Sequence, residues 1–200
     1  FLTALISMSF SFIFPAVPKN VHIVLSESGV INIKAIEESE MIFLEGYLWD
    51  EGDPKKAFDK AINGANKVAM SLSDKFCVDR HKKHFLELVK NKLDITFANE
   101  DEISSLIDAK NFNEVIEFGK NIKKCLIITR GAKGAVSIIG DNVNYVGIEK
   151  NLKLVDLTGA GDLFAAGYLH GYLNNFTYEE SLKKGTEMAS KIIQQIGARL

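Results

Sequence analysis

The sequence predicts an α/β fold with a mostly parallel sheet and helices on both of its faces. From about residue 40, short runs rich in β-branched residues alternate with longer segments of helical periodicity. Such alternation implies right-handed crossovers between parallel strands. The composition, 46% hydrophobic and 25% charged, is that of an ordinary globular chain, with no repeat or internal linker. We therefore expect a single α/β domain over residues 1–200.

The segments between Met41 and Arg130 give the clearest pattern. Pro54 stands near the start of a helical segment, where a missing N–H is tolerated. Phe58, Ala61 and Ile62 then recur at helical spacing. We expect strands at 41–46, 68–73, 94–99 and 125–130, and helices at 53–67, 79–92, 100–109 and 112–122.

The remaining elements follow the same alternation. The stretch 134–148, "GAVSIIGDNVNYVGI", predicts a hairpin that turns at residues 140–142. The apolar run "LKLVDL", residues 152–157, predicts a short strand. Two helices, 160–173 and 178–196, complete the pattern.

Residues 1–30 are the uncertain segment of the chain. Their apolar run resembles the core of a signal peptide, but no basic residues precede it, and Pro15 and Pro18 interrupt it before it reaches membrane-spanning length. We interpret the segment as a pair of strands or as the edge of an incomplete chain. We expect no membrane partner.

Charge and cysteine content narrow the partners and the compartment. With 24 basic and 26 acidic residues the formal charge is −2, so we expect no nucleic-acid partner. Cys77 and Cys125 are far apart and belong to no CxxC or Cys/His cluster. This usage favours a reducing, cytoplasmic protein, with Cys125 as a small core residue.

A glycine-rich turn, "VDLTGAGDLFAAG" at Val155–Gly167, leads into the first of the two C-terminal helices. Gly159 and Gly161 allow a tight turn and a close approach to a ligand. The unpaired N–H groups and the dipole at a helix N-terminus favour an anion. The turn therefore predicts a phosphate-binding site.

Asp162 needs a role in such a site, because a carboxylate repels a bound phosphate. We interpret it as a general base that takes the proton of a substrate hydroxyl during attack on a terminal phosphoryl group. The structural alternative is a carboxylate that complements the helix dipole. A dinucleotide fingerprint would need a small residue where Phe164 stands, and a Walker A loop is absent.

The motif D-x-T-G-A-G-D at Asp156–Asp162 resembles the signature of the ribokinase-like (PfkB-type) carbohydrate kinases. The resemblance implies a ribokinase-like fold, with Asp162 as the catalytic base. It further implies an anion hole at Gly159, Ala160 and Gly161, and a monovalent-cation site, for K⁺, at Asp156 and Thr158.

Two further motifs follow the order of the same family. Asn99 and Glu102 form N-x-x-E, which the resemblance places near the Mg²⁺–phosphate group, with the carboxylate acting through water. By itself this spacing is more typical of a helix cap. Thr129, Gly131 and Gly134 form T-x-G-x-x-G, which borders the nucleotide in the family. The resemblance thus implies ATP and Mg²⁺ as cofactors.

The stretches "EGYLWD" and "LSDKFCVDRH" look most like bacterial adenosine kinase-like sugar kinases. The resemblance implies phosphoryl transfer to a sugar or nucleoside by a protein that could form a homodimer. It runs from about Met41 to Leu200, so we expect the N-terminal part of the family fold to be missing. The alternatives are a catalytically silent nucleotide- or sugar-binding fragment of this fold and a dinucleotide-dependent oxidoreductase.

Four other residues leave functional interpretations open. His81 and His84 have a spacing that can bind metal, but no third ligand is near, so we expect a solvated helix face. Tyr47 and Trp49 follow a strand end, where they either line a substrate cleft or pack against other side chains.

Overall fold

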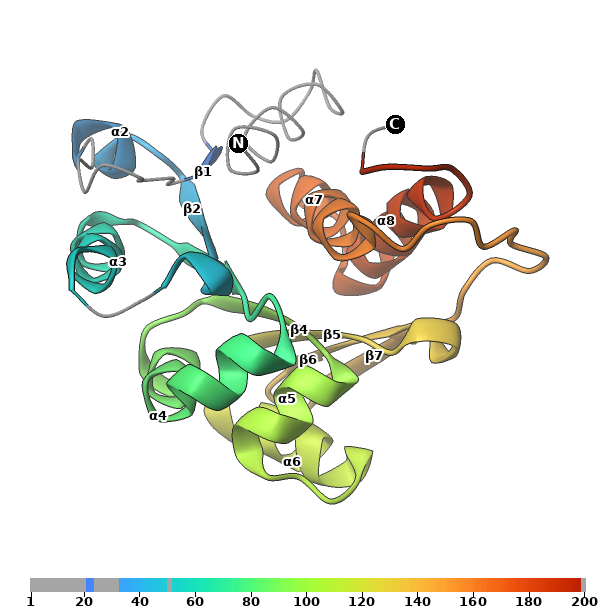
Figure 1. Cartoon of the computed structure of the whole chain (residues 1–200), viewed down its shortest axis with the longest axis horizontal. Helices are drawn as coiled ribbons and strands as arrows, with labels where there is room; N and C mark the ends of the chain where they lie inside the picture. The colour runs from blue at the N-terminus through green and yellow to red at the C-terminus, as the bar shows by residue number, and fades with distance from the viewer. Residues whose placement is uncertain (1–20, 24–32, 50–51, 199–200) are drawn as a thin grey trace. The chain divides into compact units, whose positions relative to one another are not determined.

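The computed structural model describes residues 21–23, 33–49 and 52–198 (Figure 1). These residues form two compact units. The N-terminal unit comprises residues 21–126 and 139–141, and the C-terminal unit comprises residues 127–138 and 142–198. Most of the uncertain segment 1–30 lies outside the described residues. That the whole chain is a single domain stays a prediction.

The N-terminal unit contains four neighbouring parallel strands, which confirms the parallel pairing expected from the sequence. In the register, Val21 lies opposite Met41, and Ala69 lies between Phe43 and Ile95. The strands are β1 Val21–Ile23, β2 Met41–Glu45, β3 Val68–Ser71 and β4 Ile95–Asn99. The helices are α2 Ile33–Glu37, the 3₁₀ turn η1 Gly46–Leu48, α3 Asp53–Gly64, α4 Lys75–Asn91, α5 Glu100–Ile107 and α6 Phe112–Ile122.

The core of this unit lies along its strands. Every residue of β2 is buried, as are the first three residues of β3 and the first four of β4. Since successive residues of a strand point to opposite faces, both faces of these strands are covered. This arrangement explains why the sequence shows continuous apolar runs in place of alternation.

Helix α4 begins four residues before the predicted start at Asp79. The side chain of Asp74 caps it by accepting a hydrogen bond from the backbone N–H of Cys77 at 2.7 Å. Inside the helix, His81 has non-helical angles (φ −115°, ψ 20°), which mark a kink.

The kink brings His81 and His84 against Trp49. The ring centroids of the two histidines lie 4.2 and 4.5 Å from that of Trp49, which is 4% exposed. The prediction of a solvated histidine face is therefore wrong, because both imidazoles pack on the indole. Of the two interpretations left open for Trp49, the structure shows aromatic packing, and the same residue also lines a hollow on the surface of the N-terminal unit.

The C-terminal unit combines a hairpin with two long helices. Strand β5 Cys125–Thr129 leads through the 3₁₀ turn η2 Gly131–Lys133 into β6 Ala135–Ile139 and β7 Asn142–Val146. Connections this short join antiparallel strands, so the fold contains a mixed sheet. Gly140, at φ +54°, lies in the turn between β6 and β7, which confirms the predicted hairpin.

The predicted strand at residues 152–157 is wrong. The segment has no strand partner, and Leu154, Val155 and Leu157 are exposed. The backbone N–H groups of Val155 and Asp156 instead donate to the carbonyl oxygen of Ile193, at 2.8 and 3.2 Å. An apolar run indicates a strand only where its side chains are buried, and here they are not.

Helices α7 Ala160–Leu173 and α8 Tyr178–Ile192 pack against each other (Figure 1). Residues 163–169 of α7 are all buried, as expected for a helix that is apolar on every side. Glycines allow the close contact: a Cβ atom on Gly185 would lie 2.8 Å from the carbonyl oxygen of Phe164. Helix α8 ends four residues before the predicted boundary, Ile196.

Membrane and redox features complete the description. In the part of the chain that the structure describes, no helix has the length and apolarity needed to cross a membrane. Cys77 and Cys125 form no disulfide with each other, and Cys125 is buried as predicted.

Candidate active site

The glycine turn before α7 leaves backbone donors available. Gly159 adopts the left-handed conformation (φ +78°) and caps the helix without a side-chain hydrogen bond. The first helical bond runs from the N–H of Leu163 to the carbonyl oxygen of Gly159. Among the described residues, the N–H groups of Gly161 and Asp162 find no acceptor. Two free donors at the positive end of a helix are suited to an oxyanion.

Gly161 leaves space in front of these donors. It is exposed, and a Cβ atom built on it would meet no atom within 4 Å. A ligand can therefore approach the backbone at this point without displacing protein atoms.

Asp162 presents a carboxylate in the same first turn. Asp162 is partly buried, and this burial raises the pKa of its carboxyl group above the usual range. Within the described residues it makes neither a hydrogen bond nor an ion pair. Desolvation without a compensating partner makes a carboxylate more basic, which is the property that a general base needs.

Asp156 and Thr158 form the start of the turn. The Oδ1 atom of Asp156 accepts from the N–H and the hydroxyl of Thr158, at 2.9 and 2.7 Å. Its Oδ2 atom accepts from the N–H of Gly197 at 3.0 Å. The Gly197 bond and then the Thr158 bonds lower the pKa of Asp156. The segment after α8 is thus tied to the glycine turn.

Thr129, Gly131 and Gly134 belong to the same unit, at the β5–β6 connection. Thr129 ends β5, and Gly131 (φ +54°) begins η2. Gly134 (φ +84°) has a structural reason to be glycine, because its Cβ atom would lie 2.0 Å from the carbonyl oxygen of Val146. The turn of the β strands therefore accounts for Gly134, and the predicted contact of these three residues with nucleotide stays a prediction.

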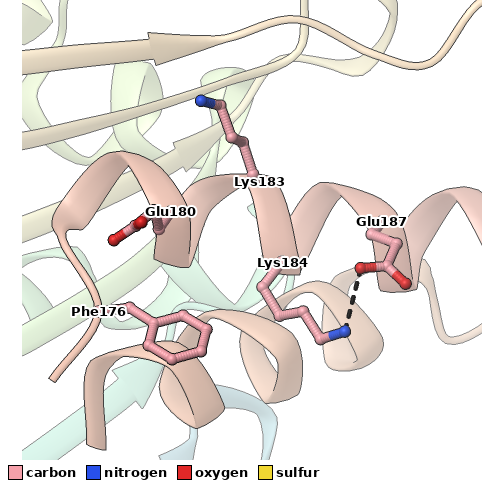
Figure 2. Close-up of a pocket in the computed structure, with 5 residues that line it drawn as sticks. All are labelled: Phe176, Glu180, Lys183, Lys184 and Glu187. Atoms are coloured by element: carbon pink, nitrogen blue, oxygen red, sulfur yellow. Dashed lines mark hydrogen bonds and ion pairs between the residues drawn. The ribbon is translucent and has the colours of Figure 1, made fainter. Parts of the chain in front are cut away.

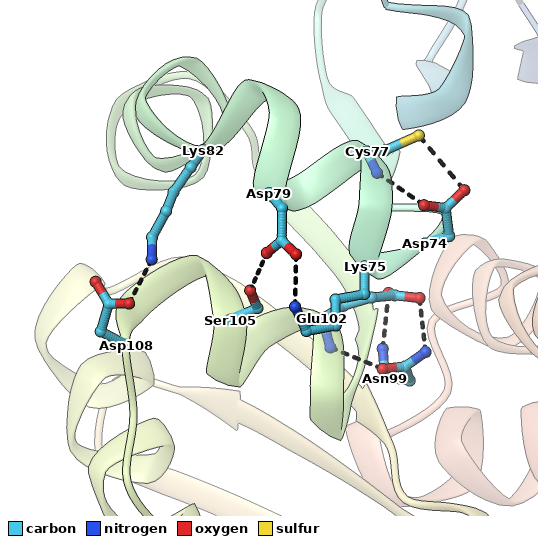
Figure 3. Close-up of polar contacts among 9 residues, drawn as sticks. All are labelled: Asp74, Lys75, Cys77, Asp79, Lys82, Asn99, Glu102, Ser105 and Asp108. Atoms are coloured by element: carbon cyan, nitrogen blue, oxygen red, sulfur yellow. Dashed lines mark hydrogen bonds and ion pairs between the residues drawn. The ribbon is translucent and has the colours of Figure 1, made fainter.

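Asn99 and Glu102 lie in the N-terminal unit and form a capping box at the start of α5 (Figure 3). Glu102 Oε2 accepts from the backbone N–H of Asn99 at 2.9 Å, and Oε1 accepts from its side-chain amide at 2.6 Å. In return Asn99 Oδ1 accepts from the N–H of Glu102 at 2.8 Å. The helix cap, one of the two interpretations that the sequence left open, is what the structure shows; the Mg²⁺ role stays a prediction.

The environment of Glu102 is unusual for a cap. The residue is only 5% exposed, and burial, followed by the charges of Asp74 and Asp101, raises its pKa. In the described part of the chain, no group of three or more His, Cys, Asp or Glu side chains is arranged to hold a metal by itself. A cation here would need oxygen atoms from a ligand such as a phosphate chain, as Mg²⁺ does in many nucleotide sites.

Asp74 is a residue near this cap that the sequence analysis did not single out. It lies shortly after the end of β3, and Asn99 is the last residue of β4; the carboxyl ends of adjacent parallel strands meet at one edge of a sheet. Burial and the Asp74 carboxylate, whose Oδ2 lies 3.5 Å from the Cys77 sulfur, raise the pKa of that thiol to about 11 (Figure 3). Cys77 is therefore a poor nucleophile. The signal in the sequence was Ser73–Asp74 directly ahead of a helical run.

Comparison with known proteins places these features in a family. Residues 17–200 match the family described as "pfkB family carbohydrate kinase". The chain belongs to this family of kinases. Membership agrees with the D-x-T-G-A-G-D motif at the start of α7 and with the α/β architecture.

Solved structures show the same fold. An adenosine kinase from Sinorhizobium meliloti is 36% identical, with a TM-score of 0.81 over 85% of this chain and 54% of that chain. A probable sugar kinase from Rhizobium etli is also 36% identical, with a TM-score of 0.78 over 84% of this chain and 53% of that chain. The ribokinase-like fold predicted from the sequence is confirmed.

Curated relatives are sugar and nucleoside kinases. A 1-phosphofructokinase of Borreliella burgdorferi is 30% identical over 60% of this chain and 42% of its own length. A nucleoside kinase of Methanocaldococcus jannaschii is 29% identical over 74% of this chain and 48% of its own length. The chain thus spans about half the length of the relatives that it matches.

Proposed function

We propose that this chain carries the phosphoryl-transfer site of an ATP-dependent kinase that acts on a hydroxyl group of a sugar or nucleoside. The observation that carries the proposal is Asp162: a carboxylate with a raised pKa and no partner among the described residues, beside two free N–H donors. A base and oxyanion donors are among the groups that a protein supplies for such a transfer.

In this proposal Asp162 accepts the proton of the acceptor hydroxyl while the hydroxyl oxygen attacks the terminal phosphorus of ATP. The bond between that phosphorus and the bridging oxygen breaks, and ADP leaves. The N–H groups at Gly159, Ala160 and Gly161 form the anion hole, although Ala160 donates to Leu157 at 3.1 Å in this structure. When bound, ATP–Mg²⁺ supplies the phosphoryl group and a cation that offsets its charge. Transfer of the hydroxyl proton to Asp162 makes the hydroxyl oxygen a stronger nucleophile.

The remaining family residues complete the nucleotide side of the proposal. Asn99 and Glu102 would bind Mg²⁺ through water, since both Glu102 oxygens already accept hydrogen bonds. The predicted nucleotide contacts are Thr129, Gly131 and Gly134.

A potassium site beside Asp156 and Thr158 has a specific requirement. The Asp156 carboxylate already accepts three hydrogen bonds, so a bound ion has to replace or share them. If K⁺ binds there, replacing KCl by the same concentration of tetramethylammonium chloride will weaken ATP binding.

The alternative is a catalytically silent protein that binds nucleotide or sugar. Its supporting observation is that both Glu102 oxygens accept hydrogen bonds within the helix cap, which gives Glu102 a structural role without any metal. Such a protein would bind ATP–Mg²⁺ without releasing ADP.

A coupled assay of ADP release by this chain tests the proposal. ATP–Mg²⁺ is supplied alone and with ribose, fructose or adenosine, for the wild type and for Asp162→Asn. The proposal expects ADP release in the wild type, stimulated by at least one acceptor, and a loss of about 10²–10⁴-fold in Asp162→Asn. ATP binding without turnover supports the silent alternative, and a thermal shift with NAD but not with ATP contradicts both.

A further inference from the structure

A hollow of about 400 Å³ lies beside Trp49, wholly within the N-terminal unit. Its size falls in the range of small-molecule sites, about 300–1,000 Å³. Neither the glycine turn nor the N-x-x-E pair contributes to it. The residues that line it are Trp49, Arg80, His81, Lys83, His84 and Glu87.

Helix α4 supplies all of the lining except Trp49. Residues 80, 83, 84 and 87 all line the hollow, although the kink at His81 interrupts the regular helical spacing after Arg80. Arg80, Lys83 and Glu87 are exposed. The hollow is therefore positively charged at the end formed by Arg80 and Lys83, and negatively charged one helical turn further on, at Glu87.

Both cations are available. Among the residues that the structure describes, Arg80 and Lys83 form no ion pair, whereas the neighbouring Lys75 and Lys82 pair with Asp79 and Asp108 at 2.5 Å. An arginine and a lysine that line one hollow suit a phosphate, because the guanidinium can hold two oxygens while the ammonium adds charge.

The floor of the hollow is a packed aromatic cluster. Trp49 is 4% exposed, and its ring packs on His81, His84 and Phe85. The kink of α4 lies at His81, within this cluster, and irregular turns inside helices occur often at functional sites. The buried indole N–H of Trp49 has no acceptor among the described residues.

A second hollow, of about 240 Å³ along α8, differs from the first in the state of its charged residues (Figure 2). Its lining is Phe176, Glu180, Lys183, Lys184 and Glu187. There the charges are already paired: Lys184 with Glu187 at 3.0 Å and Lys183 with Glu179 at 2.6 Å. A charged ligand would have to break these pairs, so this hollow is the poorer site.

We propose that the hollow beside Trp49 binds a phosphorylated small molecule that carries hydroxyl groups, such as a sugar phosphate or a nucleoside monophosphate. Arg80 and Lys83 would hold the phosphate, and Glu87 would accept hydrogen bonds from ligand hydroxyls. This is a second site, separate in its residues from the proposed phosphoryl-transfer site.

Trp49 provides a direct readout, because it is the only tryptophan in the chain. Its fluorescence, excited at the red edge of the indole band, is titrated with ribose 5-phosphate, AMP and inorganic phosphate, and with ribose and adenosine as uncharged counterparts. We expect a saturable change with at least one of the two phosphorylated compounds, and none with ribose or adenosine. A response to ribose 5-phosphate but not AMP identifies a sugar phosphate site, and the reverse a nucleotide site.

Matched variants test whether the fluorescence change comes from binding at Arg80 and Lys83. Arg80→Gln/Lys83→Gln should weaken binding by about tenfold or more, because each charged contact contributes substantially. The control Lys60→Gln/Lys90→Gln removes the same charge from exposed positions of α3 and α4 outside the hollow. It should leave the affinity for the phosphorylated ligand unchanged. Circular dichroism checks that both double variants are folded.

Three results would overturn the proposal. The first is the absence of a saturable response to either phosphorylated compound in the wild type, or a response to inorganic phosphate alone. The second is an equal loss of ligand affinity in the control and in Arg80→Gln/Lys83→Gln. The third is loss of the response in Gly161→Val, which would place the phosphate at the glycine turn. Kinase activity does not enter these readouts, so failure of the proposed function leaves them unaffected.

Discussion

The Asp156 carboxylate accepts a hydrogen bond from the backbone N–H of Gly197 at 3.0 Å, although the two residues are 41 positions apart. The same carboxylate accepts two hydrogen bonds from Thr158. Asp156 therefore joins the segment after α8 to the turn that leads into α7. A change at this carboxylate should affect both the stability of the C-terminal unit and the geometry of the candidate site.

Asp156→Asn should lower the melting temperature at pH 7, because an amide replaces one carboxylate acceptor with a donor. The pKa of Asp156 is lowered in the folded chain, so its contribution to stability is present above the unfolded pKa, about 3.9, and is lost as pH falls through the folded pKa. The difference between wild type and variant should therefore shrink below about pH 4. Thermal melts from pH 3 to pH 8 measure it, with Asp141→Asn, at an exposed position, as control.

Asp162→Asn should separate stability from activity. Burial without a partner raises the pKa of Asp162, so its charged form opposes folding above the unfolded pKa. The variant should melt at the wild-type temperature or higher at pH 7, while turnover falls by about 10²–10⁴-fold and ATP affinity changes little. In the wild type, turnover should rise as pH increases through the raised pKa. Near-normal turnover in Asp162→Asn would show that another group is the base.

Much of this arrangement could be predicted from the sequence. The strand and helix order from Met41 onward, the β6–β7 hairpin and the glycine turn at Asp162 follow from local periodicity and from residues with special backbone freedom. These features are determined by residues within a few positions of one another, so they can be predicted without knowledge of the tertiary contacts.

The errors have non-local causes. The run at 152–157 looks like a strand, but its backbone donors are taken by Ile193, some forty residues later, so no strand partner is needed. His81 and His84 look solvated because their contact with Trp49, more than thirty positions earlier in the chain, is not visible in the local pattern. The bond between Asp156 and Gly197 likewise had no signal in the sequence.

Gly159→Ala and Gly161→Ala form a pair that tests the glycine turn. Gly159 has φ +78°, and its Cβ atom would lie 2.8 Å from that of Ala198, so alanine should cost about 1–2 kcal/mol from the backbone alone. Gly161 is helical and open, so alanine should be neutral or stabilising by up to about 1 kcal/mol. Urea unfolding of both variants measures this difference. Equal destabilisation would contradict the turn geometry.

The contact between α7 and α8 depends on glycine at position 185. Gly185→Ala places a Cβ atom 2.8 Å from the carbonyl oxygen of Phe164 and 3.1 Å from its ring, so the helices must separate. We expect a loss of about 1–3 kcal/mol in the free energy of unfolding, as for other overpacked sites. Gly147→Ala, where no atom lies within 4 Å of the added Cβ, should stay within about 0.5 kcal/mol of the wild type.

Two capping boxes among the described residues offer a test of the role proposed for Asn99. Asn99 with Glu102 caps α5, and Thr177 with Glu180 caps α8, through the same reciprocal hydrogen bonds. Asn99→Ala and Thr177→Ala should each cost about 1 kcal/mol of stability, because each leaves a backbone N–H of its helix without an acceptor. Only Asn99→Ala should also weaken ATP–Mg²⁺ binding, since only that box is proposed to contact the nucleotide.

Calorimetric titration of both variants with ATP, with and without Mg²⁺, separates the two roles of Asn99. A loss of affinity that appears only with Mg²⁺ and only in Asn99→Ala supports a contact through the hydrated ion. Equal affinities in the two variants would mean that Asn99 and Glu102 cap α5 and do nothing more. The burial that raises the pKa of Glu102 would then result from helix packing alone.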